Sequence, residues 1–362
     1  MRQVFHIVSN HEWGGGEQYV YDLAQRQKAE GWQVCIFCRP IADIIQKFHT
    51  LDIDVHSLPL KGVLDMTSAL YMSRILKKAG KSATVHAHNF KDAFTATYAR
   101  KISGRKDVRV VMCRHLTRKG KNSLTYRWLY RQIDAICFDS HLSEQIFLST
   151  HPSIDPKKLH IVHTSIVAPP IPVLPAPIRQ EFGIADDTII AMYHGRLDPE
   201  KGLDILMEAT RLLNNLNFRL VLIGRGSNEY TNHLKRLCTE YNIESLVIMA
   251  GFRHPVLPYT TAADFGLLPS TVQEGCPLSP LEYMSQGRPV ITTDNGGQRE
   301  YIKNEKNGLL VQPGNANELA QAMRRLISNA GLRIQLGRQA KSDFDDHLNY
   351  SHFYHQIMQL YQ

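Results

Sequence analysis

The sequence predicts an α/β fold built from two doubly wound, Rossmann-like domains, and two observations support this. Short apolar runs alternate with helical patterns along the chain, an order typical of parallel sheets covered by helices on both faces. A proline-rich stretch interrupts this order near the middle, and the order then restarts. A chain of 362 residues with 43% hydrophobic content is long enough for two such domains.

The expected strands follow this alternation in both halves of the chain. They are residues 4–8, 34–37, 55–58, 84–86, 108–113 and 135–138 in the first half, and 188–192, 219–223, 246–249, 265–268, 290–293 and 309–311 in the second. We expect a first domain over residues 1–165, a stiff linker over 166–180 and a second domain over 181–345. Residues 346–362 should form a terminal helix, because Phe353, Ile357 and Leu360 have helical spacing.

Positive charge is concentrated in the first half. The net charge is +8, but residues 1–165 carry 24 Lys and Arg against 14 Asp and Glu, whereas the remainder carries 18 against 20. Basic clusters occur at residues 74–81, 100–109 and 114–131, and aromatic residues interrupt the last one. Each cluster alone is typical of a solvated helix face. Together the three clusters favour an anionic partner. The aromatic residues favour a membrane surface as that partner, and we expect no binding of nucleic acid.

The sequence contains no apolar run of about 20 residues, and it begins with strand-like residues instead of a leader. We therefore expect a cytoplasmic protein that can attach peripherally to the inner face of the cytoplasmic membrane. Its six cysteines are scattered, which argues against a disulfide framework. Cys35 and Cys38 have the spacing of a redox or zinc pair, but no second pair accompanies them, so we do not expect metal there.

Two carboxylates flank the expected start of a helix in the second half. Glu274 and Glu282 stand eight residues apart, and between them lie Gly275, Cys276, Pro277, Leu278 and Ser279. Free backbone N–H groups and the positive helix end can hold a diphosphate, while the carboxylates accept hydrogen bonds from hydroxyls. The segment thus suits a sugar nucleotide. The alternative is a capping box between Ser279 and Glu282, in which Glu282 only satisfies backbone donors.

A second segment, residues 193–202, follows an apolar strand and precedes a helix, and it contains Arg196 and Lys201. The end of a strand that opens into a helix is where α/β folds bind ligands. Arg196 offers a planar fork of donors to phosphate oxygens, and Lys201 offers a compact cation. Either residue alone is more often a solvated surface charge.

Together these motifs resemble those of the retaining glycosyltransferases of family 4, which have the GT-B fold of two Rossmann-like domains facing each other across a cleft. The resemblance covers nearly the whole chain, and its pieces are Gly14, Gly15, Gly16 and Glu17, residues 195–197 with 200–202, Glu274 and Glu282, and Gly296 and Gly297 with Glu300. It implies an acceptor-binding first domain, a nucleotide-sugar-binding second domain and a terminal helix that crosses back to the first. One departure is Arg225, which stands where many relatives have aspartate.

The resemblance implies a role for each motif. Arg196 and Lys201 contact the diphosphate, Glu274 contacts donor-sugar hydroxyls, and Glu282 contacts the ribose. The remaining implied donor contacts are Gly15 and Gly16, the loop-orienting Glu17, the base-proximal Gly251, Phe252 and Arg253, and the helix-start residues Gly275, Cys276, Pro277, Leu278 and Ser279.

In the first domain, His86 and His88 end a strand, and we expect one ring to enter the sheet face and the other to face the cleft. The resemblance places His88 near the reacting sugar, so His88, Glu274, Arg196 and Lys201 are the candidate catalytic residues. A His-x-His metal site is conceivable, but the sequence shows no third ligand.

Another strand ends in Arg114 and His115. Either side chain can meet an acceptor anion, and a solvated loop is equally compatible with the pattern.

The resemblance implies an enzyme of the hexosyltransferase type. It would move a sugar from a UDP- or GDP-sugar to a hydroxyl of a glycan or lipid-linked acceptor in cell-surface polysaccharide biosynthesis, including that of lipopolysaccharide. Retention also fits the lack of an evident base, since the leaving phosphate can take the acceptor proton. Two alternatives stay open: a sugar-nucleotide epimerase of the same fold, and a degenerate module that binds lipid or RNA.

We expect no cofactor and no metal requirement, because Arg196, Lys201 and helix amides can neutralise the diphosphate. The Asp-x-Asp pairs at 52–54 and 343–345 lack the nucleotide-binding setting that a metal-dependent transferase needs.

Overall fold

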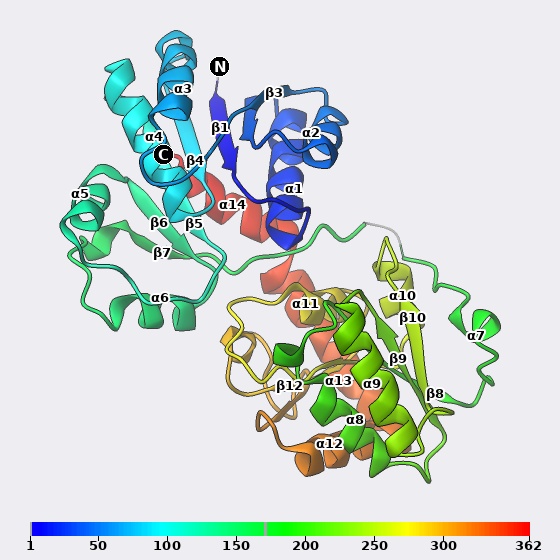
Figure 1. Ribbon diagram of the computed structural model, residues 1–362. Coiled ribbons are helices and arrows are strands. Elements are labelled where there is room, and N and C mark those ends of the chain that lie inside the picture. Colours follow the sequence, from blue (N-terminus) through cyan, green and yellow to red (C-terminus); the bar gives the residue numbers. More distant parts are fainter. Residues whose placement is uncertain (1, 170–171) are drawn as a thin grey trace. The chain divides into compact units, whose positions relative to one another are not determined.

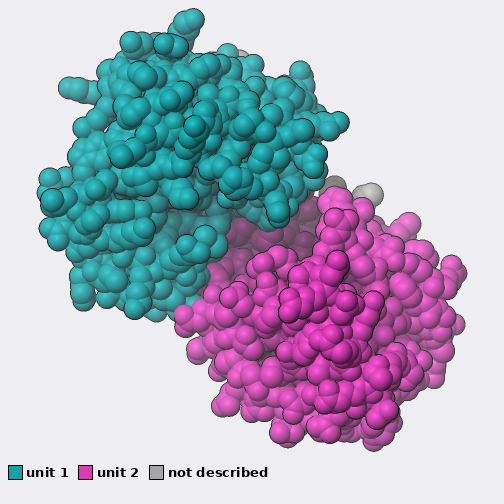
Figure 2. Space-filling view, in the orientation of Figure 1, with its two compact units in different colours: residues 1–163, 351–362 teal, residues 164–350 magenta. Residues whose placement is uncertain are grey.

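The computed structural model describes residues 2–169 and 172–362, and it divides into two compact units (Figures 1 and 2). Unit 1 comprises Met1–His163 and Ser351–Gln362, and unit 2 comprises Thr164–Tyr350. Residues 170 and 171 of the expected linker lie outside the described residues. The rest of that linker belongs to unit 2. Of the expected terminal segment, residues 351–362 belong to unit 1 and residues 346–350 to unit 2.

Unit 1 contains a seven-stranded parallel sheet in the order β3-β2-β1-β4-β5-β6-β7 (Figure 1). Its strands are β1 Gln3–Val8, β2 Gln33–Cys38, β3 Asp54–Ser57, β4 Ala83–Ala87, β5 Arg109–Arg114, β6 Ala135–Phe138 and β7 Leu159–Ile161. Its helices are α1 Gly15–Ala29, α2 Ala42–His49, α3 Met66–Lys78, α4 Phe90–Ser103, α5 Leu124–Gln132, α6 His141–Leu148 and α14 Tyr350–Leu360. Six of these strands match the expected ones. The seventh, β7, was missed because three half-buried residues leave almost no alternating pattern.

The two faces of this sheet differ in chemistry. One face packs an aliphatic and aromatic core that includes Phe5, Phe37 and Val85. The opposite face carries the buried polar residues His6 and His86, together with Cys113. These polar side chains lie beneath α1 and α14, because Gln27 of α1 contacts His6 and Tyr361, just after α14, contacts His86.

Helix α14 therefore joins residues that are distant in sequence within unit 1. Phe353 lies edge-on to Tyr19 of α1, with ring centroids 5.3 Å apart. The Tyr354 hydroxyl donates to Glu30 at 2.9 Å. Helix α14 thus covers the polar face of the sheet.

Unit 2 contains a six-stranded parallel sheet in the order β10-β9-β8-β11-β12-β13. Its strands are β8 Ile189–His194, β9 Phe218–Ile223, β10 Val247–Gly251, β11 Phe265–Leu268, β12 Val290–Thr293 and β13 Leu309–Val311. Its helices are α7 Ile178–Glu181, α8 Leu203–Arg211, α9 Asn228–Glu240, α10 Leu257–Ala262, α11 Leu278–Ser285, α12 Ala316–Ser328 and α13 Ala330–Asp343. Ala191 and Tyr193 of β8 enter one core and Ile190 and Met192 enter another, so helices cover both faces.

Both sheets reverse their strand order at one point, between β1 and β4 in unit 1 and between β8 and β11 in unit 2. In open α/β sheets, ligands bind beyond the carboxyl ends of the strands at such a point. These two points therefore locate the residues that matter for function. Across the described residues, no helix is long and apolar enough to cross a membrane.

Candidate active site

In unit 2, the loops after β8 and β11 bring Lys201 and Glu274 together. Lys201 Nζ lies 2.5 Å from Glu274 Oε1, and the side chains are only 18% and 15% exposed. Ser270 Oγ donates to the same carboxylate oxygen at 2.6 Å. The lysine and carboxylate expected to contact the donor thus form one partly buried pair, 73 residues apart in sequence.

A glycine makes this meeting possible. Gly202, directly after Lys201, has φ +71°, and a Cβ atom there would lie 2.0 Å from the carbonyl oxygen of Pro269. No other residue type fits so close to that backbone. The Thr271 N–H donates to the Glu200 carbonyl at 3.0 Å and joins the two loops.

The glycine pair Gly296 and Gly297 supports the same loop from its other side. The Gly297 N–H donates to the Glu274 carbonyl at 2.8 Å. The carboxylate is thus placed by its own backbone as well as by Lys201 and Ser270.

Helix α11 begins at Leu278, with Pro277 as its N-cap residue, and no side chain caps it. Glu282 is the fifth residue of the helix, beyond the reach of a capping box. The capping-box alternative is therefore wrong: because the helix starts one residue before Ser279, Pro280 occupies the position where the box needs its carboxylate.

Glu282 instead faces His194, the last residue of β8. Glu282 Oε2 and His194 Nε2 lie 3.2 Å apart, without the alignment of a hydrogen bond. Burial raises the pKa of the Glu282 carboxyl to about 7 and lowers the pKa of the His194 imidazole to about 4. His194 is neutral at pH 7, so the contact is not an ion pair. The sequence motif contained His194, but nothing in its pattern marked it as a partner of Glu282.

Among the expected donor-binding residues Arg196, Lys201, Glu274 and Glu282, Arg196 is the exposed one. Its side chain is 71% exposed and contacts Asp198 at 3.2 Å. It lies in the loop after β8, and backbone hydrogen bonds from Gly195 to Ile223 and from Gly224 to Gly251 tie together the loops after β8, β9 and β10. Gly224 has no room for a side chain, because a Cβ there would lie 1.8 Å from the Gly195 carbonyl oxygen.

The expected base-contact segment has one feature that the sequence did not reveal. The Arg225 guanidinium lies over the Phe252 ring, 4.6 Å from its centroid, and Phe252 is 55% exposed. Arg253 is engaged with Glu181 through an ion pair. Gly251 and Phe252, together with Arg225, thus form the exposed part of this segment.

In unit 1, α1 begins inside the glycine loop. Its first residue is Gly15, and Gly14 is its N-cap. Glu17 is buried and accepts hydrogen bonds from the Gly14 N–H at 3.0 Å and from the Asn10 amide. Its carboxylate thus fixes the loop, and Gly15 and Gly16 present the first amides of the helix.

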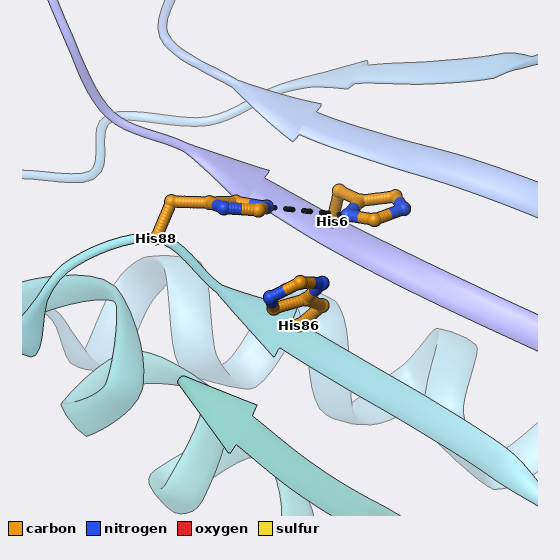
Figure 3. Close-up of side chains that lie close together, drawn as sticks. All are labelled: His6, His86 and His88. Carbon is orange, nitrogen blue, oxygen red and sulfur yellow. Dashed lines mark hydrogen bonds between the residues drawn. The ribbon is translucent and has the colours of Figure 1, made fainter. Parts of the chain in front are cut away.

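His86 and His88 lie on one face, contrary to the expectation that they diverge. Their ring centroids are 4.3 Å apart, since residues two apart in a strand share a face. His6 of β1 joins them as the third histidine that the sequence analysis missed, with Nδ1 3.2 Å from His88 Nε2 (Figure 3). Strand pairing could have revealed it, because His6 and His86 are direct partners in the β1–β4 register.

The surroundings keep His6 and His88 neutral. Burial, together with His86, lowers the pKa of His6 to about 3, and the same causes hold the pKa of His88 well below its usual value. His88 is half-buried, whereas His6 and His86 are fully buried. His88 is therefore the member of the cluster that a ligand can reach.

The pair at the end of β5 separates into a buried and an accessible residue. Arg114 is buried, and its guanidinium lies 5.0 Å from the Phe90 ring centroid and 4.8 Å from that of Phe147. Burial lowers its pKa to about 10. His115 is half-buried, and its Nε2 lies 3.3 Å from His88 Nδ1. Of the two expected acceptor contacts, the structure thus extends the histidine cluster with His115 and packs Arg114 among aromatic rings.

The Asp-x-Asp segments have local partners. Asp52 pairs with Lys28 at 2.8 Å, Asp343 accepts from Asn307 at 2.6 Å, and Asp345 pairs with Lys341 at 2.5 Å. None of these carboxylates lies at the carboxyl ends of the strands where the two sheets reverse order.

Two family models match the chain. "Glycosyltransferase Family 4" matches residues 13–167, and "Glycosyl transferases group 1" matches residues 176–343. Among curated relatives, an uncharacterized glycosyltransferase of Methanocaldococcus jannaschii is 29% identical over 187 residues, 51% of this chain and 47% of that protein. The chain thus spans about half the length of the first curated relatives it matches.

A longer match is the UDP-Gal:α-D-GlcNAc-diphosphoundecaprenol α-1,3-galactosyltransferase of Escherichia coli. It is 27% identical over 292 residues, 75% of this chain and 73% of the relative. Among solved structures, Anabaena HepE in complex with UDP has a TM-score of 0.85 at 18% identity, covering 99% of both chains. The lipopolysaccharide outer core galactosyltransferase WaaB has a TM-score of 0.75 at 19% identity over 99% of both chains. These likenesses establish the expected GT-B fold.

Proposed function

Because this chain belongs to the glycosyltransferases of group 1 and family 4, we propose that it transfers a sugar from a nucleoside diphosphate sugar to a hydroxyl of a glycan or lipid-linked acceptor, with retention of configuration. The observation that carries the proposal is the Lys201–Glu274 pair, which lies in the loops after β8 and β11. A cation and a carboxylate in contact suit a ligand that carries a phosphate next to hydroxyls.

The diphosphate is bound by Lys201, Arg196 and the first amides of α11. Lys201 is held by Glu274 and supplies a positioned charge, whereas the exposed Arg196 closes on the ligand from solvent. The amides of Leu278 and Ser279 lie at the positive end of α11, which has no side-chain cap competing for them.

Glu274 and Glu282 bind different sugars of the donor: Glu274 binds the transferred sugar and Glu282 binds the ribose. Glu274 accepts hydrogen bonds from hydroxyls of the transferred sugar, and its contact with Lys201 fixes the position of the carboxylate. Glu282 accepts from the ribose. Burial raises the pKa of the Glu282 carboxyl to about 7 in the structure without ligand. A ribose hydroxyl that donates to the carboxylate stabilises its charged form and so favours loss of the carboxyl proton.

The transfer step uses charge placement rather than a protein base. Positive charge at Lys201 and Arg196 stabilises the leaving diphosphate, and an oxygen of that diphosphate takes the proton from the acceptor hydroxyl as the sugar departs. His88 is the accessible member of the cluster that it forms with His6 and His86, and burial keeps it neutral. It donates or accepts one hydrogen bond to the sugar without adding charge.

We also propose reversible contact with an anionic membrane. Two exposed lysines lie between two exposed leucines from the end of β5 to the first residue of α5: Leu116 and Leu124 are 60% and 81% exposed, and Lys119 and Lys121 are exposed as well. Apolar residues next to cations suit the interface of an anionic bilayer. The E. coli relative is named for a diphosphoundecaprenol-linked substrate, which supports a lipid-linked acceptor for this chain.

Nucleotide binding tests the proposal most directly. Thermal unfolding with UDP, GDP and ADP identifies the base, and ligand at 100 times its Kd should stabilise by about 2.7 kcal/mol. UDP is the first choice, because the Anabaena structure contains UDP. Each UDP-sugar is then incubated with the enzyme, and NMR of the product reports the anomeric configuration. Inversion would contradict retention, and no shift with any nucleotide would contradict the donor site.

A further inference from the structure

We propose that His6, His86 and His88 form a binding site for one divalent transition-metal ion, preferably Zn²⁺, inside unit 1. One ring nitrogen of each residue lies within 4.8 Å of those of the other two (Figure 3). The site is formed by unit 1 residues alone, and it is separate from the cations and amides expected to hold the donor diphosphate. His88 Nε2 would then hold the ion instead of a sugar hydroxyl, so this proposal replaces the sugar contact proposed above for His88.

The sheet fixes the positions of these ligands. His6 and His86 are paired residues of the adjacent parallel strands β1 and β4, and His88 follows on the same face. Tetrahedral zinc with Zn–N bonds of about 2.0–2.1 Å requires nitrogens about 3.3 Å apart. His6 Nδ1 and His88 Nε2 already stand 3.2 Å apart, which is close to this spacing, and small ring rotations are needed to direct all three nitrogens at one ion.

Each ring also has a partner for its other nitrogen. His6 Nε2 lies 2.8 Å from Gln27 Oε1, and His88 Nδ1 lies 3.3 Å from His115 Nε2. His86 contacts the Tyr361 hydroxyl through Nδ1 at 2.7 Å and Cys113 Sγ through Nε2 at 3.0 Å. Whichever His86 nitrogen turns to the ion, the other keeps a partner. Metal-binding histidines are typically oriented in this way, by a hydrogen bond from the nitrogen that does not bind the ion.

Gln27 determines which nitrogen of His6 can bind. The amide oxygen can only accept, so His6 Nε2 carries the hydrogen and Nδ1 presents its lone pair to His88. Without an ion, His88 Nε2 carries a hydrogen and donates it to His6 Nδ1. An ion would replace that hydrogen, which moves to Nδ1 of the same ring and points at His115.

The chemistry of the donor atoms selects the ion. The group contains three imidazoles and no carboxylate, which suits zinc, nickel, cobalt or copper and disfavours magnesium, calcium and manganese. Cys113 Sγ lies 3.0 Å from His86 Nε2, but it is not one of the three donor atoms that lie together.

The test compares zinc binding by tag-free protein and three variants, with a chromophoric chelator as competitor and with metal content measured after dialysis. The wild-type chain should retain about one zinc per chain, and His6→Gln should lose it. Gln27→Met removes the hydrogen-bond acceptor of His6 and the donor to the Tyr361 hydroxyl, and it should weaken zinc binding about 10- to 100-fold. His56→Gln is the matched control, because His56 lies in the same sheet and contacts Tyr71 instead of the cluster.

Cobalt gives a second readout that needs no variant. Co²⁺ bound by three histidines should produce the visible absorption of a tetrahedral site, and Zn²⁺ but not Mg²⁺ should abolish it. If His6→Gln fails to fold, this competition and the Gln27→Met variant decide the question. Zinc binding no tighter in the wild type than in Gln27→Met, or no tetrahedral cobalt spectrum, would overturn the proposal and leave the cluster as a hydrogen-bonded network.

Discussion

Glu282 Oε2 lies 3.2 Å from His194 Nε2, yet burial keeps the histidine neutral and raises the pKa of the carboxyl to about 7. This pair joins α11 to the end of β8, which lie in the two segments that the sequence singled out independently. Because its pKa is raised to about 7, Glu282 changes charge near neutral pH.

The folded protein should lose stability as the pH rises through the range in which Glu282 ionises. The folded pKa of about 7 exceeds the usual value of 4.5, so the folded state holds a proton that the unfolded state has lost between these pH values. Glu282→Gln removes this dependence. We expect the Tm difference, variant minus wild type, to increase from pH 4.5 to pH 7.5 in calorimetric scans. A difference that stays constant with pH would contradict the raised pKa.

Substitution of Glu274 and of Glu282 should affect different steps, turnover for Glu274 and nucleotide binding for Glu282. Glu274→Gln should lower kcat more than the affinity for free UDP, because the transferred sugar is absent from UDP. Glu282→Gln should weaken UDP itself, because the ribose is present. Calorimetric titration with UDP and initial rates with the UDP-sugar separate these effects, and equal losses of nucleotide affinity in both variants would refute the assignment.

Lys201→Ala should weaken nucleoside diphosphate binding by about 1.5–3 kcal/mol, which corresponds to roughly 10- to 100-fold in Kd. Arg196→Ala should have a smaller effect, because that side chain is mostly exposed and screened by water. Lys235→Ala, an exposed lysine of α9, is the control and should bind normally. Unchanged titration curves for both Lys201→Ala and Arg196→Ala would remove these residues from the site.

Transfer should not require added Mg²⁺ or Mn²⁺, because Lys201, Arg196 and the amides of α11 already neutralise the diphosphate. Rates measured with EDTA and with each ion in excess should agree within about twofold, well under the tenfold change that 1.4 kcal/mol produces. A strict requirement for either ion would show that carboxylates take part in diphosphate binding.

Membrane contact should depend on the segment between β5 and α5. Lys119→Glu with Lys121→Glu should reduce co-sedimentation with anionic liposomes, and high salt should weaken wild-type binding, because charges are screened over about 8 Å at physiological ionic strength. Lys235→Glu with Lys306→Glu makes the same charge change at exposed lysines of unit 2, outside the three basic clusters, and serves as the control. Equal sedimentation with neutral and anionic vesicles would count against the electrostatic contact.

The sequence predicted the strands far better than the contacts between them. Twelve expected strands form because buried parallel strands read as short apolar runs, whereas β7 has too few buried residues to leave that pattern. Lys201 and Glu274 could be named from their motifs. Their ion pair could not, because it depends on how two loops meet at the edge of the sheet.

The histidine cluster illustrates the same limit. His86 and His88 were visible as a motif, but His6 stands 80 residues earlier than its strand partner, with nothing around it to mark it. Only the order of strands makes β1 and β4 neighbours. The start of α11 shows a smaller error: a capping box at Ser279 needs the helix to start at residue 280, and a shift of two residues to Leu278 was enough to exclude it.

The return of residues 351–362 to unit 1 has a consequence for the order in which the chain folds during synthesis. Unit 2 is continuous from Thr164 to Tyr350 and can fold as soon as it leaves the ribosome. Unit 1 starts first but has to wait for Phe353, Tyr354 and Tyr361, which contact Tyr19, Glu30 and His86. Until then the polar face of its sheet is only partly covered. The half of the chain that the ribosome makes first is thus the half that is completed last.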